Sequence, residues 1–191
     1  MIVKLLLEAG ADFNGYTDET VLCTVVKLTN MAIVELLLRA GADVNTPPHT
    51  DSETALCTAV QSAKVGIVEL FLKVGAEIKV HSGTIGKITL QMAVQFRNME
   101  MVELLLKAGA DVNFPSRYRG ETVLYTAVKS RNPAIVKLLL QSGVDVNTPS
   151  GEETYQWILK SPSETALCAT VRLGKSEIVE LLLEAGAENR K

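Results

Sequence analysis

Residues 33–45 read IVELLLRAGADVN, and lightly edited copies of this stretch recur along the whole chain. The copies occupy residues 2–14, 67–78, 101–113, 135–147 and 178–189. In chain order, their first residues are separated by 31, 34, 34, 34 and 43 positions. A sequence period of this size is typical of a solenoid, in which each unit hides its apolar side against the next unit.

A second phrase lies between successive copies. It reads ETALCTAV at residues 53–60, and related versions occupy residues 19–26, 87–94, 121–128 and 164–171. Together the two phrases resemble the ankyrin repeat, whose usual pattern is a Thr-Pro-Leu-His start to a first helix, a Gly turn, and an Ile-Val-x-x-Leu-Leu second helix that ends in Gly-Ala-Asp-Val-Asn. The resemblance implies an all-α solenoid of stacked helix-turn-helix repeats with projecting finger loops that resemble β-hairpins.

The resemblance covers essentially all 191 residues, so we expect one array and no second domain. Its expected units are a half-repeat at 1–14 and repeats at about 15–46, 47–80, 81–114, 115–148 and 149–191. The abrupt start inside a second helix suggests a cap or a piece of a longer array. The third full unit fits the pattern least well, because Ile88 replaces the usual Thr and residues 77–79 read EIK where DVN is usual.

The ends of the second helices carry strong local signals. A glycine stands where a left-handed residue is needed to end each of them, at Gly10, Gly41, Gly75, Gly109, Gly143 and Gly186. Three asparagines, Asn30, Asn98 and Asn132, precede second helices as N-caps, and Pro133 follows at the first helical position, where a missing N–H costs nothing.

Two slots depart from the family pattern. The turn between the two helices usually has Gly, but this chain has Thr29, Ala63, Arg97 and Arg131 there, and only Gly174 conforms. Each of the four costs on the order of 1 kcal/mol relative to Gly if it is held at positive φ. The family's His, which joins repeats by hydrogen bonds, is replaced by Cys23, Cys57, Gln91, Tyr125 and Cys168. Because a thiol is a weak donor, we expect the cysteines to remove a polar link.

Composition excludes several kinds of partner. The formal net charge is −3, so the chain has no global basic field for nucleic acid or anionic lipid. No run of about 18 apolar residues and no signal peptide occurs, which predicts no membrane insertion. The three cysteines occupy equivalent slots of separate repeats, too far apart for a disulfide. We therefore expect reduced thiols, no metal site and no cofactor, and an intracellular monomer.

The finger before the last repeat is the longest. The step from the Asn slot to the Thr slot is 18 residues between Asn147 and Thr165, against a usual eight. The insertion, residues 148–163, carries Tyr155, Trp157 and Ile158. Exposed aromatic residues on such a loop are typical binding anchors. The open alternatives are that these side chains pack on the base of the loop, or that the insertion is disordered.

Further partner-binding candidates lie on other fingers and on the inner surface that the resemblance implies. The finger candidates are His49, His81, Phe114, Arg117, Tyr118 and Arg119. The inner-surface candidates are Leu28, Phe96, Lys129, Arg172 and Leu173. The three apolar members could instead cover neighbouring stems. The basic residues around Arg97, Arg117, Arg119, Lys129 and Arg131 could form a local positive patch for an acidic partner segment, or simply be solvated charge.

The sequence contains no motif that would perform chemistry. Residues 83–87, GTIGK, lack the spacing of a phosphate-binding loop, and a Cys57–His pair would use a cysteine that belongs to a packed helix start. The Asn residues at 14, 45, 113 and 147 are interpreted as closing the hairpin stems by hydrogen bonds to backbone; they also match a position that hydroxylases modify in some family members.

We predict a non-enzymatic module that binds a protein or peptide through its concave groove and fingers. The alternatives are a sensor or scaffold segment of a larger signalling protein, and a small-molecule pocket, even a catalytic one, under the long finger.

Overall fold

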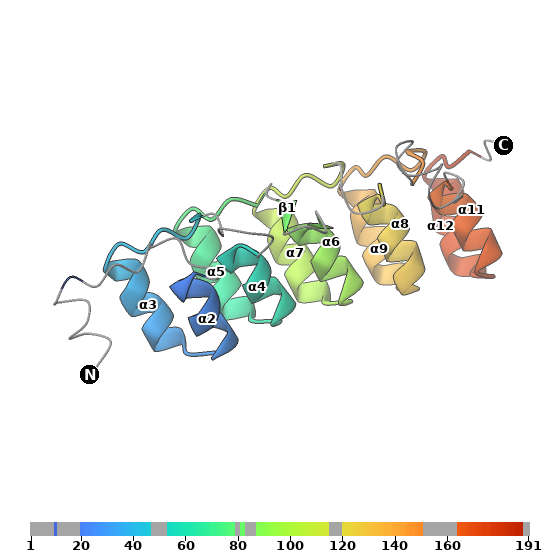
Figure 1. Ribbon diagram of the computed structural model, residues 1–191. Helices are drawn as coiled ribbons and strands as arrows, with labels where there is room; N and C mark the ends of the chain where they lie inside the picture. The colour runs from blue at the N-terminus through green and yellow to red at the C-terminus, as the bar shows by residue number, and fades with distance from the viewer. Residues whose placement is uncertain are drawn as a thin grey trace, which may run out of the picture.

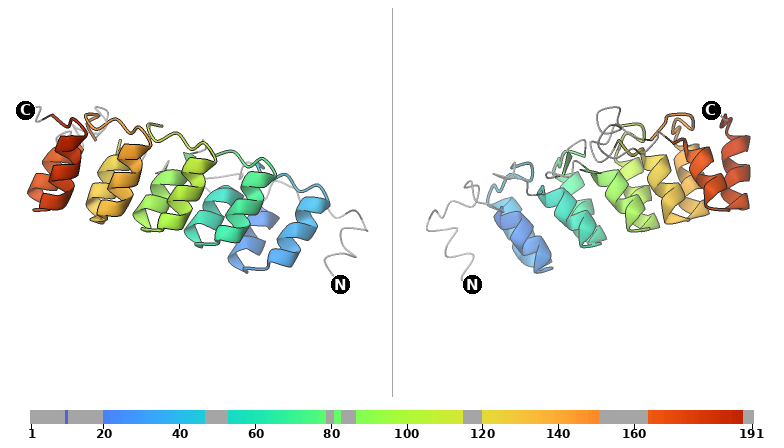
Figure 2. Two further views of the ribbon diagram at one scale, coloured as in Figure 1. Left: turned by 180° about the vertical axis from the view of Figure 1, so that it is seen from behind. Right: turned by 45° about the vertical axis from the view of Figure 1, so that its right-hand side comes forward.

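The computed structural model describes residues 10, 20–46, 53–78, 81–82, 87–114, 120–150 and 164–188. In these residues, helix pairs stand side by side in a single row (Figure 1). The turns that join the two helices of a pair lie along one edge of the row, and the connections between pairs run along the opposite edge (Figure 2). The predicted all-α solenoid is therefore confirmed.

Each described pair consists of a short first helix and a longer second helix. The first helices are α2 (Val21–Lys27), α4 (Ala55–Gln61), α6 (Thr89–Gln95), α8 (Val123–Ser130) and α11 (Ala166–Arg172). The second helices are α3 (Met31–Arg39), α5 (Val65–Lys73), α7 (Met99–Lys107), α9 (Pro133–Gln141) and α12 (Ser176–Glu184).

The helices begin where side-chain oxygens cap them. The hydroxyls of Thr20, Thr54, Thr122 and Thr165 accept the backbone N–H three residues later, at the starts of α2, α4, α8 and α11. The predicted caps Asn30, Asn98 and Asn132 do the same for α3, α7 and α9, and Pro133 is the first residue of α9. Each cap satisfies a backbone donor that the helix itself leaves unpaired.

The predicted left-handed turns are present. Thr29, Ala63, Arg97 and Arg131 have φ of 57°, 52°, 56° and 56°, close to the 65° of Gly174 in the same slot. The next residue's N–H closes the turn by reaching back into the first helix, as in Lys64 N to Ala59 O at 3.0 Å. The helix end is thus satisfied by a backbone conformation that residues with a Cβ adopt at a cost.

Two of the connections pair as strands at their bases. Strand β1 (His81–Ser82) pairs antiparallel with β2 (Lys87–Ile88), so this finger has the predicted hairpin form. A single antiparallel bridge joins Ser150 to Glu164, with N–H···O distances of 2.9 and 3.0 Å. The long finger therefore leaves the array and returns to it through a closed base.

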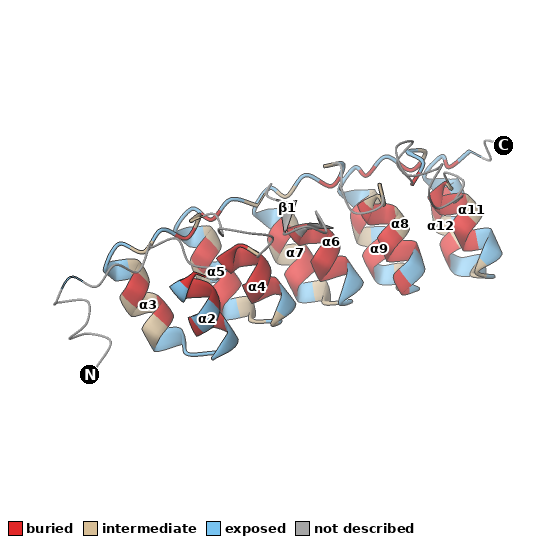
Figure 3. Cartoon of the chain, in the orientation of Figure 1, coloured by how far each residue is buried: buried red, intermediate tan, exposed pale blue. Residues whose placement is uncertain are grey.

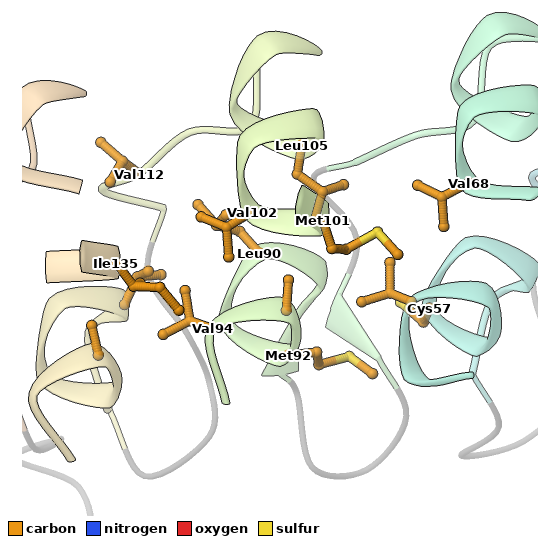
Figure 4. Packing of buried hydrophobic residues seen from close by; sticks show 14 of the residues in the cluster. Cys57, Val68, Leu90, Met92, Val94, Met101, Val102, Leu105, Val112 and Ile135 are labelled. Atoms are coloured by element: carbon orange, nitrogen blue, oxygen red, sulfur yellow. The ribbon is translucent and has the colours of Figure 1, made fainter. Parts of the chain in front are cut away.

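The core is continuous along the row. The inner first helices are buried on nearly every side: in α4 all residues except Gln61 are buried, because α2 and α6 flank it (Figure 3). Second helices bury one stripe, such as Ile67, Val68 and Phe71 in α5. The buried apolar residues of the described repeats belong to one cluster, and Figure 4 shows part of it, with side chains such as Cys57, Met101 and Ile135 from neighbouring repeats.

The last helix pair has an uncovered side. Val171 is 63% exposed, whereas Val128, in the equivalent slot of the preceding repeat, is 0% exposed. Leu183 is exposed, although the corresponding leucines, such as Leu140, are partly buried against the core. The same residue type is therefore interior or surface according to whether another repeat lies beside it.

Candidate partner-binding surface

A glutamate stands before the N-cap threonine in three repeats of the described chain, at Glu53, Glu121 and Glu164. Each carboxylate is bonded by the residue eight positions later, at the end of the same first helix. Glu53 accepts from Gln61, and Glu121 Oε1 lies 2.8 Å from Lys129 Nζ. Glu164 holds Arg172 at two points, Nε to Oε1 at 3.1 Å and Nη2 to Oε2 at 2.9 Å. These bonds brace each first helix along its length.

The last two described repeats are joined by an aromatic side chain. Tyr125 Oη donates to Glu164 Oε2 of the next repeat at 3.0 Å, and Lys129 Nζ lies 5.5 Å from the centroid of the Tyr125 ring. Tyr125 thus packs beneath one cation and donates to the carboxylate that binds Arg172. The charged side chains here form one network that links α8 to α11.

The network shifts two pKa values in opposite directions. The pKa of Glu164 is lowered, chiefly because Arg172 donates to its carboxylate. The pKa of Tyr125 is raised, first by burial and then by its hydrogen bond to Glu164. Both shifts favour the protonation states that make the Tyr125–Glu164–Arg172 contacts.

At the position where the family usually has histidine, the cysteines of this chain still make polar contacts with the next repeat. The prediction that cysteine removes this link was therefore wrong. Cys23 Sγ accepts from Thr20 Oγ1 at 3.1 Å and donates to Glu53 O of the next repeat at 3.3 Å. Cys57 Sγ lies 3.6 Å from Thr89 Oγ1 of the next repeat. The thiol suffices because the stacked repeat places an oxygen within reach of it.

Gln91 fills the same slot and bonds twice across the repeat boundary. Its Nε2 donates to Glu121 O at 3.2 Å and to Thr126 Oγ1 at 3.0 Å. Its Oε1 is buried and accepts no hydrogen bond from the described residues. An unmatched acceptor of this kind costs about 1–3 kcal/mol, which offsets part of the stabilisation from the two bonds that Gln91 donates.

The asparagines after the second helices also join repeats, which corrects the interpretation that they close their own hairpin stems. Asn113 Nδ2 donates to Gly143 O at 3.1 Å, and its Oδ1 accepts from Asp145 N at 2.8 Å. Asn45 and Asn147 make the same pair of bonds one repeat ahead. Each asparagine therefore fixes the end of the next second helix.

A polar groove lies between α6 and α8. Its volume is about 260 Å³, and its lining includes Gln91, Arg97, Glu121, Thr126, Lys129 and Ser130. Lys129 and Glu121 are paired, whereas the guanidinium of Arg97 forms no hydrogen bond or ion pair with the described part of the chain. The groove is thus walled by one neutralised pair and one guanidinium that none of the described residues binds.

Comparison with known proteins agrees with this architecture. A sequence model of the ankyrin repeats (three copies) matches residues 1–82 and 62–150. The chain belongs to the ankyrin repeat family. Among solved structures, the array is similar to the ankyrin repeat domain of Bcl-3, a member of the IkappaB protein family, with a TM-score of 0.81 and 26% identity over 98% of this chain and 79% of that one. No curated protein matches the chain.

The ankyrin array presents the predicted partner-binding residues in three different ways. Leu28 and Phe96 stand in the same slot of different repeats and are 69% and 53% exposed. Phe114 and Leu173 are partly buried and pack against the core, which favours a supporting role for them. Lys129 and Arg172 bind glutamates of their own repeats.

Other predicted residues lie outside the described part of the array. These are His49, Arg117, Tyr118, Arg119, Tyr155, Trp157 and Ile158, together with the side chain of His81. Their assignment to partner binding stays a prediction.

Sequence reasoning missed the glutamates that organise this surface. The sequence does contain a sign of their role, because Glu recurs at the same position of four repeats, at 19, 53, 121 and 164. The role of Tyr125 had no such signal, since its acceptor is 39 residues away.

Within the described residues, no three His, Cys, Asp or Glu side chains gather in a way that could hold a metal ion. Among the helices searched in those same residues, none is long and apolar enough to cross a membrane.

Proposed function

We propose that this ankyrin array is a non-enzymatic protein-recognition module, which binds a partner protein or peptide through the face formed by its first helices and through its fingers. The exposure of Leu28 and Phe96 carries the proposal. Both follow a first helix, at a slot where Ser62 and Ser130 show that a small polar residue suffices. Large apolar side chains that the frame does not bury are available to a partner.

The frame suits this function because its repeats are joined along the edge of the row from which the fingers project. Hydrogen bonds from the histidine slot join neighbouring repeats at the starts of first helices, and the asparagines join them at the ends of second helices. Side chains on such a frame lose little further freedom when a partner binds, so less of the contact energy is offset by ordering.

The test compares proteins captured from a cell lysate by the intact array and by a Leu28→Ser/Phe96→Ser variant, scored by quantitative mass spectrometry. Serine is the residue that two other repeats have in this slot, so stability should change by less than about 0.5 kcal/mol. Val74→Ser is the matched control, because Val74 is also exposed but ends a second helix. We expect the double variant to lose the specific partners and the control to keep them. Equal capture by all three proteins would refute the proposal.

A second variant asks what the long finger contributes. Residues 151–163 are replaced by a short Gly-Ser linker, which retains the Ser150–Glu164 bridge and the Thr122 N to Ser150 Oγ bond. The base of the finger is thereby preserved. Weaker capture together with unchanged unfolding would assign the finger to partner binding; lower stability together with unchanged capture would assign it to the frame.

We further propose that the array acts as a monomer inside the cell. Cys23, Cys57 and Cys168 are thiols in the structure, which fits a reducing compartment. Size-exclusion chromatography with light scattering tests the monomer, and localisation of the tagged protein tests the compartment.

A further inference from the structure

We propose that the groove between α6 and α8 binds an acidic side chain of a partner peptide, and that an apolar residue next to that acidic residue packs on Phe96. This inference rests on the proposed function and specifies the chemistry of the partner.

The first support is the charge of the groove wall. The guanidinium of Arg97 lines the groove and forms no hydrogen bond or ion pair with the described residues, unlike those of Arg39 and Arg172, which are bound to Glu35 and Glu164. A guanidinium with all its donors available is suited to a carboxylate, which it can hold at two points. Lys129 and Glu121 neutralise each other, so the net positive charge of the groove wall comes from Arg97.

The second support is the neighbour of that guanidinium in the chain. Phe96 is exposed and directly precedes Arg97 in the chain, so a bound peptide that reaches the guanidinium has an uncovered apolar side chain one residue away. A ligand that satisfied both would carry a carboxylate next to a large apolar side chain. A polyanion such as nucleic acid fits poorly, because the chain as a whole has a formal charge of −3 and would repel it.

The backbone of the slot provides a way to test the role of Arg97. Arg97 is held at φ 56°, where glycine would be unstrained. Thr29, Ala63 and Arg131 share this conformation, so the strain belongs to the slot and not to the guanidinium. This feature also separates binding from folding: Arg97→Gly removes the guanidinium and relieves the strain in the same step.

The experiment uses peptides selected from a random phage-display library on the full chain. The recovered sequences are synthesised with a fluorophore, and their dissociation constants are measured by fluorescence polarisation. We expect the selected peptides to be enriched in Asp or Glu beside Leu, Ile, Phe or Trp. We expect Arg97→Gly to bind them at least about ten times more weakly, as for loss of a charge-assisted contact, while its urea midpoint rises. Binding to the intact chain should weaken as salt is added.

The matched control is Ala63→Gly, which relieves the same strain one repeat away without removing a charge. It should also become more stable, but it should bind the peptides as tightly as the parent chain. Peptides without acidic residues, or equal affinity for Arg97→Gly and the parent, would overturn the inference. If Arg97→Gly bound the peptides as tightly as the parent but Phe96→Ser bound them more weakly, this inference would fail and the proposed function would stand. Recovery of no binding peptide would count against both.

Discussion

Replacing Ala63 by glycine should stabilise the array, although it removes a methyl group and raises the conformational entropy of the unfolded chain. Ala63 is held at φ 52° in the turn between α4 and α5. This left-handed conformation destabilises the folded state by roughly 1–2 kcal/mol for a residue with a Cβ. Glycine avoids that cost, but it loses about 0.4–1 kcal/mol more backbone entropy on folding. The difference is a net gain of about 1 kcal/mol, because Lys64 N still closes the turn on Ala59 O.

The assay is equilibrium unfolding in urea, followed by circular dichroism, with the change in the midpoint converted through the slope of the parent protein. A gain of this size corresponds to a rise in Tm of about 2–4 °C for a chain of this length. A solenoid can unfold in parts, so the slopes must agree before the free energies are compared.

Two Gly→Ala variants with opposite expected effects on stability make the test specific. Gly174→Ala places a Cβ at φ 65° and should destabilise the array by about 1 kcal/mol. Gly66→Ala lies in the first turn of α5, where the new Cβ would meet Met31 Cε at an ordinary 4.0 Å, and should stabilise by about 0.5 kcal/mol. The reasoning is refuted if Ala63→Gly leaves the midpoint unchanged or lowers it while Gly66→Ala raises it.

Three further predictions follow from contacts between and within repeats. Val128→Ala should cost about 2 kcal/mol in urea unfolding and Val171→Ala less than about 0.5, since only the first side chain is covered; equal costs would contradict the burial argument. Asn113→Ala should cost about 1–3 kcal/mol in the same assay, because it leaves a carbonyl and an N–H of the next repeat without their partner; an unchanged midpoint would mean that water replaces both bonds. The carboxylate of Glu164 has a lowered pKa, so its contribution is complete above the ordinary value of 4.5 and is lost as the pH falls through its lower folded value. The difference in unfolding free energy between the parent and Glu164→Gln should therefore shrink as the pH is lowered below 4.5, and a constant difference would exclude the ion pair with Arg172 as its cause.

Features that depend on nearby residues could be predicted well. The caps at Asn30, Asn98 and Asn132, the glycines after the second helices and the strained turns all lie where the pattern placed them. Each is decided within about one helical turn, by a side chain that bonds its own backbone or by the φ that a helix end requires. The repeat period predicted the fold in the same way, because the same local sequence pattern recurs in every repeat.

Contacts across the repeat boundary were predicted least well. Asn113 and Cys23 were interpreted from their own hairpin and their own chemistry, yet their partners lie 30 or more positions later in the chain. Lys129 looked available in the sequence and proved to be paired with Glu121. In each case the deciding atom belongs to a segment whose position is set only when the helices are packed.

The sequence by itself determined that this chain stacks helix pairs, where each pair begins and ends, and which turn residues bear strain, since these are properties of short stretches repeated several times. Only the tertiary structure decided which equivalent residues are interior and which are surface. Val128 and Val171 carry the same side chain in the same slot, and one is covered while the other is not, because burial depends on the neighbour beside a residue and not on the residue alone.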